Sequence, residues 1–338
     1  MAGPMRSAIA TGGLELPWPR LRLPLIAAPM LRISGPALVT AACRNGVVGA
    51  FPTANARTVE ELDQWLTTIR ADLDEREAGK AEPAPFCPNL IIRQPRLQDD
   101  LACLVRHRVE MVITSVGSPA AVVGPLHDVG CMVLADVASV AHAEKALQAG
   151  ADGLVLLSAG AGGQTGWANG MAFARAVRAF YDGPLVLAGG ISDGHALWAA
   201  RVLGCDLGYM GTKFIATAES MADARHKEMV VASRLDDVLR TRAFTGLDTN
   251  MLRPSIEAAG LDADGLDESV TFEEAKARFG GGKAHDKPKR WSDIWSAGHT
   301  VSGVSDVGSV AALIATTCRE YEAARLRTQA LLSDQPPA

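Results

Sequence analysis

Residues 185–214 read LVLAGGISDGHALWAARVLGCDLGYMGTKF, and this stretch contains the unit from which the fold can be predicted. Two short apolar runs, LVLAGG (185–190) and LGYMGTKF (207–214), place glycines where we expect a strand to open into a helix. The residues between them have apolar positions three and four apart, which is typical of a helix packed on a sheet. A strand, a helix and a second strand in this order form a βαβ unit with parallel strands.

The same unit repeats through the preceding part of the chain. Six more short runs rich in Val, Leu or Ile come before it: LPLIAAP (23–29), VVGAF (47–51), FCPNLII (86–92), MVITS (111–115), CMVLADV (131–137) and GLVLLS (153–158). Their lack of polar alternation indicates strands that are buried on both faces. Eight repeats before residue 235 favour a closed (β/α)8 TIM barrel of the α/β class over an open doubly wound sheet.

Two polar stretches interrupt the repeat. ADLDEREAGKAEPAP (71–85) precedes the third strand and is typical of a solvated loop. Residues 235–304 show no strand repeat, and we predict that they form a smaller C-terminal lobe or lid over the active-site face. The barrel then comprises residues 22–234 and 305–330, with a last helix over residues 309–327 that packs back on it.

Composition and charge exclude several classes of protein. The 338 residues carry a formal net charge of -5, whereas a nucleic-acid binder shows a basic domain or stripe. The N-terminus lacks the apolar stretch of a signal peptide, and no window of about 18 apolar residues indicates a membrane span. The six scattered cysteines contain no CxxC pair, and no HxxxH or paired-carboxylate spacing indicates a metal site. We therefore expect a cytoplasmic protein with a small-molecule partner, no nucleic-acid or membrane partner, and no metal.

The glycines that follow the last two strands are candidates for a phosphate site. A barrel enzyme commonly binds phosphate after strands seven and eight, where backbone N–H groups and a helix N-terminus face the anion. The residues at these positions are Gly189, Gly190, Gly211 and Thr212. The alternative is that these glycines only form tight turns between strand and helix.

A second cluster, SAGAGGQTGWANG (158–170), follows the sixth strand. We expect a backbone-rich loop at the active face, with Gln164 at its centre. An ordinary flexible glycine loop remains the alternative.

Together these motifs resemble those of the nitronate monooxygenase family, formerly called 2-nitropropane dioxygenases. The family also includes NADH:quinone reductases and flavin-dependent enoyl reductases. The resemblance rests on APM (28–30), PNL (88–90), the Gly-Gly loop after the sixth strand, AGGI (188–191) and MGTKF (210–214). WSAGHTVSGVSDVGSV (295–310) is similar to the C-terminal segment of the family.

The resemblance implies that FMN lies across the C-terminal mouth of the barrel. Ala28, Pro29 and Met30 would then line the isoalloxazine ring, and Asn89 and Asp136 would supply polar contacts to the ring or the ribityl chain. Gly162 and Gly163 would approach the flavin edge. The phosphate would be held by Gly189, Gly190, Gly211 and Thr212.

The chain departs from the family pattern at Gln164, because the family usually has its catalytic histidine at this position. Glutamine can form hydrogen bonds, but it has no pKa near neutrality and cannot act as a general base. We therefore assign Gln164 a hydrogen-bonding role toward substrate and expect neutral nitroalkanes to be poor substrates, since their α-proton must be removed. His285 and His299 are the candidates for a replacement base.

Several functions are compatible with these motifs. The leading interpretation is an FMN-dependent monooxygenase that oxidises alkyl nitronates with O2. The same fold could instead serve an NAD(P)H-dependent quinone or enone/enoyl reductase, a flavin-free barrel enzyme acting on a phosphorylated metabolite, or a non-catalytic flavin-binding protein. The basic loop GGGKAHDKPKR (280–290) could clamp a nucleotide or CoA phosphate, or it could simply be solvated. Family analogy suggests a homodimer.

Overall fold

The computed structural model describes residues 18–75, 81–280 and 288–333. Eight parallel strands close into a barrel in the order β1-β2-β3-β4-β5-β6-β8-β9. Each strand coincides with one of the eight apolar runs, so the prediction of a (β/α)8 barrel is confirmed. The strands are β1 (Leu25–Ala27), β2 (Val48–Pro52), β3 (Phe86–Ile91), β4 (Met111–Ser115), β5 (Met132–Val137), β6 (Gly153–Leu157), β8 (Leu185–Ala188) and β9 (Leu207–Met210).

The inside of the barrel is filled by side chains from all eight strands. Alternate residues of a strand point to opposite faces, so every second residue faces the barrel axis. These inward residues form one apolar cluster: Ile26, Val48, Ala50, Cys87, Met111, Ile113, Met132, Leu134, Val155, Val186, Ala188 and Leu207. The residues between them pack outward against the helices, which is why the runs show almost no polar alternation.

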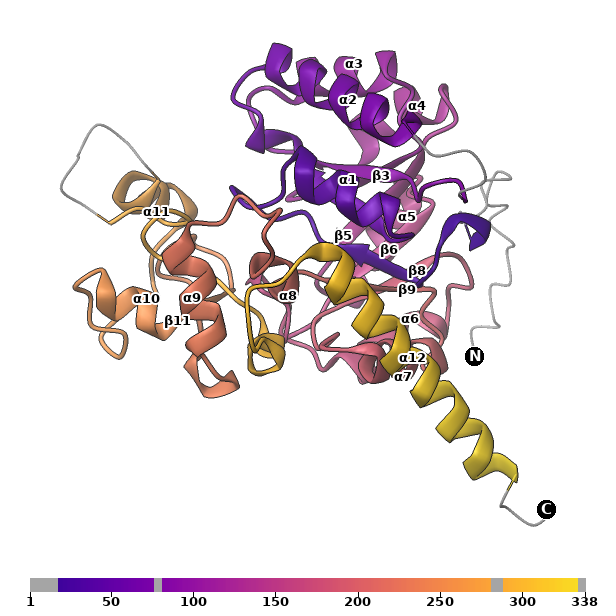
Figure 1. Ribbon diagram of the computed structural model, residues 1–338. Coiled ribbons are helices and arrows are strands. Elements are labelled where there is room, and N and C mark those ends of the chain that lie inside the picture. The colour runs from indigo at the N-terminus through magenta and orange to yellow at the C-terminus, as the bar shows by residue number, and fades with distance from the viewer. Residues whose placement is uncertain (1–17, 76–80, 281–287, 334–338) are drawn as a thin grey trace, which may run out of the picture.

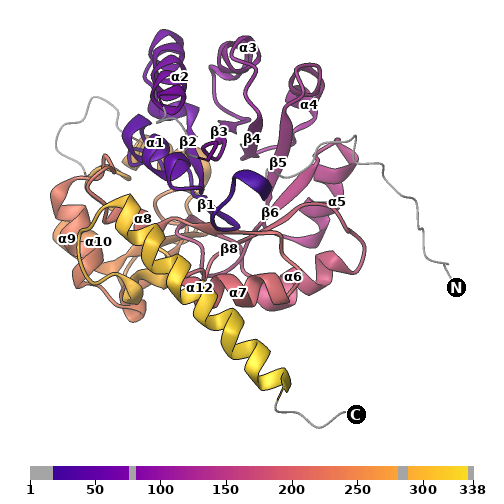
Figure 2. The same cartoon turned by 45° about the vertical axis from the view of Figure 1, so that its right-hand side comes forward.

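A ring of helices surrounds the strands (Figure 2). Five of these helices begin at a Thr, Ser, Asn or Asp whose side chain accepts a backbone N–H of the first turn, such as Ser139 at α5 and Asp193 at α7. The helices that follow the strands in sequence are α1 (Pro36–Arg44), α2 (Val59–Asp74), α3 (Leu97–Arg106), α4 (Ala120–His127), α5 (Val140–Gln148), α6 (Gly170–Arg178), α7 (Gly194–Val202), α8 (Thr212–Ile215) and α9 (Ala224–Ala232).

The last helix, α12 (Val310–Ser333), completes the ring. It packs against α7 and α1, where the eighth outer helix of a barrel is expected, because α8 is only one turn long. The predicted helix over residues 309–327 is therefore confirmed, and it extends further toward the C-terminus. Figure 1 shows its C-terminal half projecting away from the barrel.

A second group of elements lies to one side of the barrel (Figure 1). It contains β10 (Val238–Thr241), β11 (Thr249–Leu252), α10 (Arg253–Ala258) and α11 (Phe272–Phe279), and α9 is drawn beside them. This segment shows no strand repeat in its sequence, yet it contains two strands. β10 and β11 are only four residues long, and they pair with β7 (Gly163–Gln164) from the loop after β6, so no sequence repeat reveals them. The lobe boundaries at residues 235 and 304 stay a prediction. Four 3-10 helices complete the described chain: η1 (Trp18–Arg20), η2 (Thr53–Asn55), η3 (Leu235–Asp237) and η4 (His299–Gly303).

The predicted loop over residues 71–85 is shorter than expected, because α2 continues to Asp74. Leu62, Leu66, Ile69 and Leu73 are buried along one side of this helix at the spacing of a helical face. The acidic residues at its end, Asp74 and Glu75, are exposed, whereas Asp72 is half-buried. Such charges are as typical of the solvated face of an amphipathic helix as of a loop.

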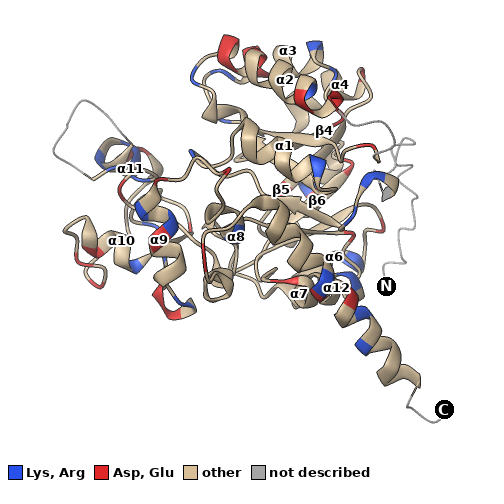
Figure 3. Ribbon diagram, viewed as in Figure 1, with Lys and Arg blue, Asp and Glu red and all other residues tan. Residues whose placement is uncertain are grey.

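Charged side chains gather on the helices and loops, whereas the barrel strands are almost free of them (Figure 3). Among the eight described barrel strands, the only Asp, Glu, Lys or Arg is Asp136 on β5. No helix in the described part of the chain is long and apolar enough to cross a bilayer.

Candidate active site

A cavity of about 420 Å³ opens at the C-terminal ends of the barrel strands, which is the size of a typical small-molecule site. All twelve residues that the sequence assigned to the site line this one cavity. They are Ala28, Pro29, Met30, Asn89, Asp136, Gly162, Gly163, Gln164, Gly189, Gly190, Gly211 and Thr212. The structure therefore brings together residues that are spread over 185 positions of the sequence (from 28 to 212, both included).

The floor of the cavity is the last inward-facing layer of the barrel. Seven strands contribute the residue two positions beyond their last core residue, whereas β8 contributes the core residue Ala188 itself. Alternate residues of a strand point to the same face. The floor consists of Ala28, Pro52, Asn89, Ser115, Asp136, Leu157, Ala188 and Tyr209, all of which line the cavity. Ala188 belongs to both the core and the floor. Any ligand that enters the barrel mouth meets this layer first.

Two polar residues of the floor differ in their hydrogen bonding. The Asn89 amide donates to the carbonyl of Ile113 and to the Ser115 hydroxyl, both at 3.2 Å, so its orientation is fixed. Asp136 is different: its Oδ1 is buried and has no hydrogen-bond partner among the described residues. Burial raises the pKa of Asp136 from 3.8 to about 7, because a low-dielectric surrounding disfavours the charged form.

The glycine turns after β8 and β9 offer backbone to the cavity. Gly190 has a φ of 81°, and no atom lies within 4 Å of the position a Cβ would take, so open space adjoins its backbone. The N–H groups of Thr212 and Lys213 open α8 and have no helical carbonyl to bind. The N-terminus of α7 is already capped by the Asp193 carboxylate. The geometry thus favours Gly190 and the start of α8 as anion contacts, rather than α7.

The glycine-rich loop after β6 is held firmly in place. Its β7 segment pairs with β11, so that Gln164 lies opposite Thr249. The Asn250 amide donates to the carbonyls of Ala159 and Ala161 at 2.9 and 2.7 Å. The interpretation of this loop as an ordinary flexible glycine loop is therefore wrong, because the lobe supplies both a strand and a side chain that fix it.

The position that a Cβ would take at Gly162 faces protein, although Gly162 itself is exposed and lines the cavity. A Cβ at Gly162 would lie 2.7 Å from the backbone nitrogen of Gly298. The Gly298 N–H in turn donates to the Thr212 hydroxyl at 2.8 Å, so this hydroxyl already accepts one hydrogen bond. Residues 297–298 therefore join the loop after β6 to the turn after β9 across one side of the cavity.

Of the two histidines proposed to replace the missing base, the one that the structure describes, His299, does not line the cavity. The side chain of His299 is exposed and lies outside the cavity lining, although its backbone N–H binds the Gly160 carbonyl. His285 lies outside the described residues. His195, at the start of α7, is also exposed.

A different histidine, His226 on α9, does line the cavity. Its ring stacks on Trp295 with centroids 5.1 Å apart, and Nε2 lies 3.2 Å from the Ser296 carbonyl. A carbonyl only accepts, so Nε2 carries the proton. Burial lowers the pKa of His226 to about 4, and the ring is neutral at pH 7. No sequence feature singles out this residue, which follows the last barrel strand in an ordinary helical segment.

Cationic side chains surround the outer part of the cavity. Arg93, Lys276 and Arg290 all line it, together with Phe272 and Trp291. The Arg290 guanidinium donates to the Phe244 carbonyl at 2.9 Å and lies 6.0 Å from the centroid of the Phe272 ring. Asp136 is the only carboxylate among the described lining residues. The field at the mouth is therefore positive, and it favours anionic ligands. Residues 281–287 of the basic loop lie outside the described part of the chain.

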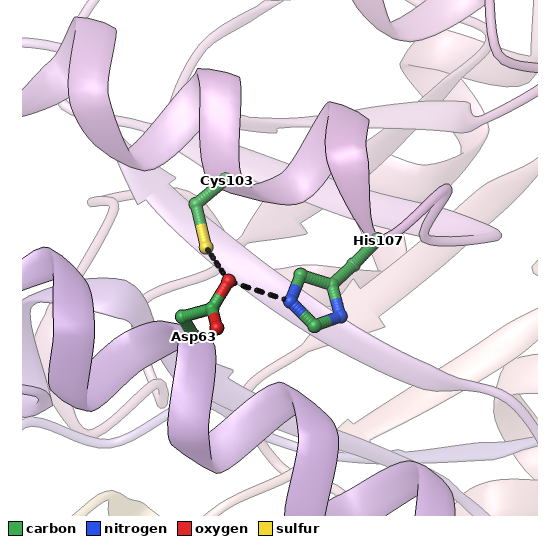
Figure 4. Close-up of side chains that lie close together, drawn as sticks. All are labelled: Asp63, Cys103 and His107. Carbon is green, nitrogen blue, oxygen red and sulfur yellow. Dashed lines mark hydrogen bonds and ion pairs between the residues drawn. The ribbon is translucent and has the colours of Figure 1, made fainter.

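A histidine–cysteine–aspartate cluster lies away from the cavity, between α2 and α3 (Figure 4). Asp63 Oδ1 accepts hydrogen bonds from His107 at 2.9 Å and from Arg106 at 3.1 Å, and the Cys103 thiol lies 3.7 Å away. Metal binding requires a thiolate, whereas burial raises the pKa of Cys103 to about 11. The Asp63 carboxylate is also paired with the Arg106 guanidinium. We therefore interpret this cluster as a hydrogen-bonded contact between two helices.

Known proteins share both the sequence pattern and the fold. A family model described as nitronate monooxygenase matches residues 19–320. The nitronate monooxygenase of Pseudomonas aeruginosa is 28% identical, with 75% of this chain and 80% of that protein aligned. A 5-hydroxy-7a-methyl-1-oxo-octahydro-1H-indene-4-carboxyl-CoA dehydrogenase of Rhodococcus jostii is 26% identical over 69% of this chain. The match spans 63% of the length of that dehydrogenase, which is less than two thirds.

Solved structures agree on the architecture. FabK from Thermotoga maritima superposes with a TM-score of 0.78 at 23% identity, over 93% of this chain and 97% of that one. Nitroalkane oxidase from Streptomyces ansochromogenes gives a TM-score of 0.73 at 23% identity, over 91% and 98% of the two chains. At this identity the likeness concerns the fold. Because the family model covers most of the residues, the chain belongs to the nitronate monooxygenase family of oxidoreductases.

Proposed function

We propose that this protein is an FMN-dependent monooxygenase that oxidises alkyl nitronates with O2. The observation that carries the proposal is the convergence of all twelve predicted site residues on one cavity at the C-terminal mouth of the barrel. Members of the family are flavin-dependent, and this mouth is where barrel enzymes build their active sites.

The cavity fits FMN in three respects. Open space adjoins the Gly190 backbone, where a phosphate needs a close approach. Helix α8 opens beside it with backbone N–H groups that no helical carbonyl uses. At the floor, Asp136 Oδ1 is buried with no partner in the described part of the chain, as expected for a group whose partner is a ligand.

These features suggest which residues would hold each part of FMN. Gly189, Gly190, Gly211 and Thr212 would hold the phosphate, whereas Ala28, Pro29, Met30, Asn89 and Asp136 would contact the ring system, with Gly162 and Gly163 at its edge. The bound flavin supplies the electron transfer.

Gln164 would orient the substrate in this site. Its amide N–H can donate to a nitro oxygen, and its position is fixed by the pairing of β7 with β11. A nitronate is already an anion, so its oxidation needs no general base. The positive field from Arg93, Lys276 and Arg290 would draw such an anion toward the mouth.

The test is an absorbance spectrum of the purified protein after FMN addition, followed by anaerobic mixing with propyl-2-nitronate and, separately, with NADH. We expect flavin absorbance that bleaches with nitronate and not with NADH. Bleaching with NADH alone would instead indicate a quinone or enone reductase. A protein that takes up no flavin would contradict the proposal and favour a flavin-free barrel enzyme.

A second candidate is a reductase or dehydrogenase that acts on CoA-linked substrates. The observation in its favour is the group of three cations beside Phe272 and Trp291, because a nucleotide offers phosphates and a stacking base to such a surface. The Rhodococcus jostii relative is named for a CoA ester, which agrees with this candidate.

Binding of CoA distinguishes this candidate from the first. If Arg93 and Lys276 contact the phosphates, the double variant Arg93→Gln/Lys276→Gln should weaken binding of propionyl-CoA by about tenfold at low salt. Arg278→Gln is the matched control on α11, because Arg278 pairs with Asp267 and does not line the cavity. Isothermal titration calorimetry measures both. An equal loss in the control would argue for a general charge effect, and binding unchanged in both variants would argue against a CoA site.

A further inference from the structure

We infer that Asp136 holds a proton at the cavity floor and donates it, as a hydrogen bond, to a carbonyl oxygen of the flavin ring. This inference rests on the proposed function. It adds the protonation state of Asp136 and says which partner donates in its hydrogen bond to the flavin ring. A carboxylic acid kept neutral in this way acts as a donor, whereas an ionised carboxylate can only accept.

The position of Asp136 in the barrel is the first argument. It is the only Asp, Glu, Lys or Arg in the eight described barrel strands, and it extends the inward series that begins with Met132 and Leu134. Its Oδ1 is buried with no hydrogen-bond partner among the described residues, although it lines the cavity. A buried polar atom without a partner has lost the hydrogen bonds that it would form in water, so it is expected to meet a ligand atom.

The barrel order gives the second argument. The proposed phosphate contacts follow β8 and β9, and β5 lies two strands from β8 and three from β9 in the closed order. Asp136 is therefore set apart from the phosphate contacts by at least one intervening strand, β6. FMN anchored at Gly190 and Gly211 would extend its ring across the floor toward β3, β4 and β5. The group that meets Asp136 is then the ring, whose pyrimidine edge carries two carbonyl acceptors.

The surroundings of Asp136 keep its proton in place. The titratable groups that interact electrostatically with Asp136 are Cys87 on β3 and Tyr209 on β9. Burial raises the pKa of the thiol and of the phenol well above their usual values. Both are therefore neutral at pH 7. On the adjacent strands β4 and β6 the inward residues are uncharged. Burial alone raises the pKa of Asp136 to about 7, and the cations Arg93, Lys276 and Arg290 do not offset this shift.

The prediction concerns flavin affinity as a function of pH. If the protonated acid donates to the ring, the dissociation constant should be constant below pH 7 and should rise by up to tenfold per pH unit above it. The sign follows because ionisation removes the donor and places a negative charge against a carbonyl oxygen. Riboflavin is the probe, because it lacks the phosphate, whose second pKa of about 6 would add its own pH dependence. Quenching of its fluorescence in an equilibrium titration gives the constant without any turnover.

Two variants make the experiment decisive. Asp136→Asn keeps an N–H donor of the same shape, and its dissociation constant should be independent of pH and close to the wild-type value at low pH. Asp136→Ala removes the donor, so its constant should also be independent of pH but larger by about tenfold. Circular dichroism checks that both variants are folded.

Other outcomes would overturn the inference. A pH profile that persists in Asp136→Asn, or a wild-type affinity that does not change with pH, would show that Asp136 does not donate. An affinity that improves above pH 7 would show that the ionised carboxylate accepts from the ring N–H. Riboflavin and FMN binding without pH dependence would leave the proposed function intact, whereas no uptake of either flavin would contradict both.

Discussion

Gln164→His should raise kcat/KM for nitroethane by about two to four orders of magnitude, which is the usual contribution of a general base. Position 164 lines the cavity, and the backbone there is fixed by the pairing with Thr249, so a new imidazole would occupy the place of the amide. An imidazole has a pKa near 6.5 and can remove the α-proton of a neutral nitroalkane, whereas an amide cannot. Steady-state oxygen consumption at pH 8 measures the change.

The matched substrate and a matched variant separate base catalysis from other effects. Ethylnitronate has already lost its α-proton, so its turnover should change little in Gln164→His. Gln164→Ala removes the amide that we propose to donate to the substrate, and it should weaken nitronate turnover without creating any nitroalkane activity. High wild-type activity with neutral nitroethane that survives Gln164→Ala would contradict the role we assign to Gln164.

The barrel could be predicted from sequence because its strands are buried on both faces. Each of the eight runs therefore stands out as a short apolar segment, and no other common fold needs eight in succession. The floor residues Asn89 and Asp136 could be placed for the same reason, because strand alternation and the C-terminal end of each run fix their positions. The glycines that follow the seventh and eighth barrel strands, β8 and β9, could be placed for the same reason.

Part of the remaining cavity wall could not be predicted. His226 and Lys276 come from segments that follow the last barrel strand, and their place over the mouth depends on how the lobe docks. Arg290 also lines the cavity, and it belongs to the basic loop (280–290) for which the sequence suggested a phosphate contact. The docking of the lobe uses the two-residue strand β7 and the Asn250 side chain, and neither leaves a periodic pattern in the sequence. His285 and His299 were therefore the histidines that the sequence suggested, whereas His226 is the one that lines the cavity.

The same limit explains the missed strands. β10 and β11 are stabilised by pairing with each other and with β7, so their identity as strands depends on a segment 74 residues before β10 (238 against 164). Local propensity does not encode such a contact, since strand preference mostly reflects the packing partners that the fold provides.

Gly194→Ala should lower the free energy of unfolding by about 3 kcal/mol, at the upper end of the usual cost of overpacking. Gly194 begins α7 at the contact with α12, and a Cβ there would lie 2.1 Å from the Tyr321 nitrogen and 2.4 Å from the Thr317 carbonyl oxygen. Both atoms belong to the α12 backbone, so no side-chain rotation relieves the clash and the two helices must separate. The Gly194 N–H also donates to Glu320 Oε2 at 3.1 Å, and this contact would be strained.

The same substitution at Gly124 provides the control, because its expected effect has the opposite sign. Gly124 lies inside α4, and no atom lies within 4 Å of the position its Cβ would take. Alanine there should stabilise the protein by up to about 1 kcal/mol through its higher helix propensity. Urea denaturation followed by circular dichroism measures both variants. Equal small effects at the two sites would mean that α12 can move away from α7 at little cost. A large loss at Gly194 alone would mean that α12 is an integral eighth helix of the barrel, because only tight packing of backbone against backbone makes one methyl group so costly.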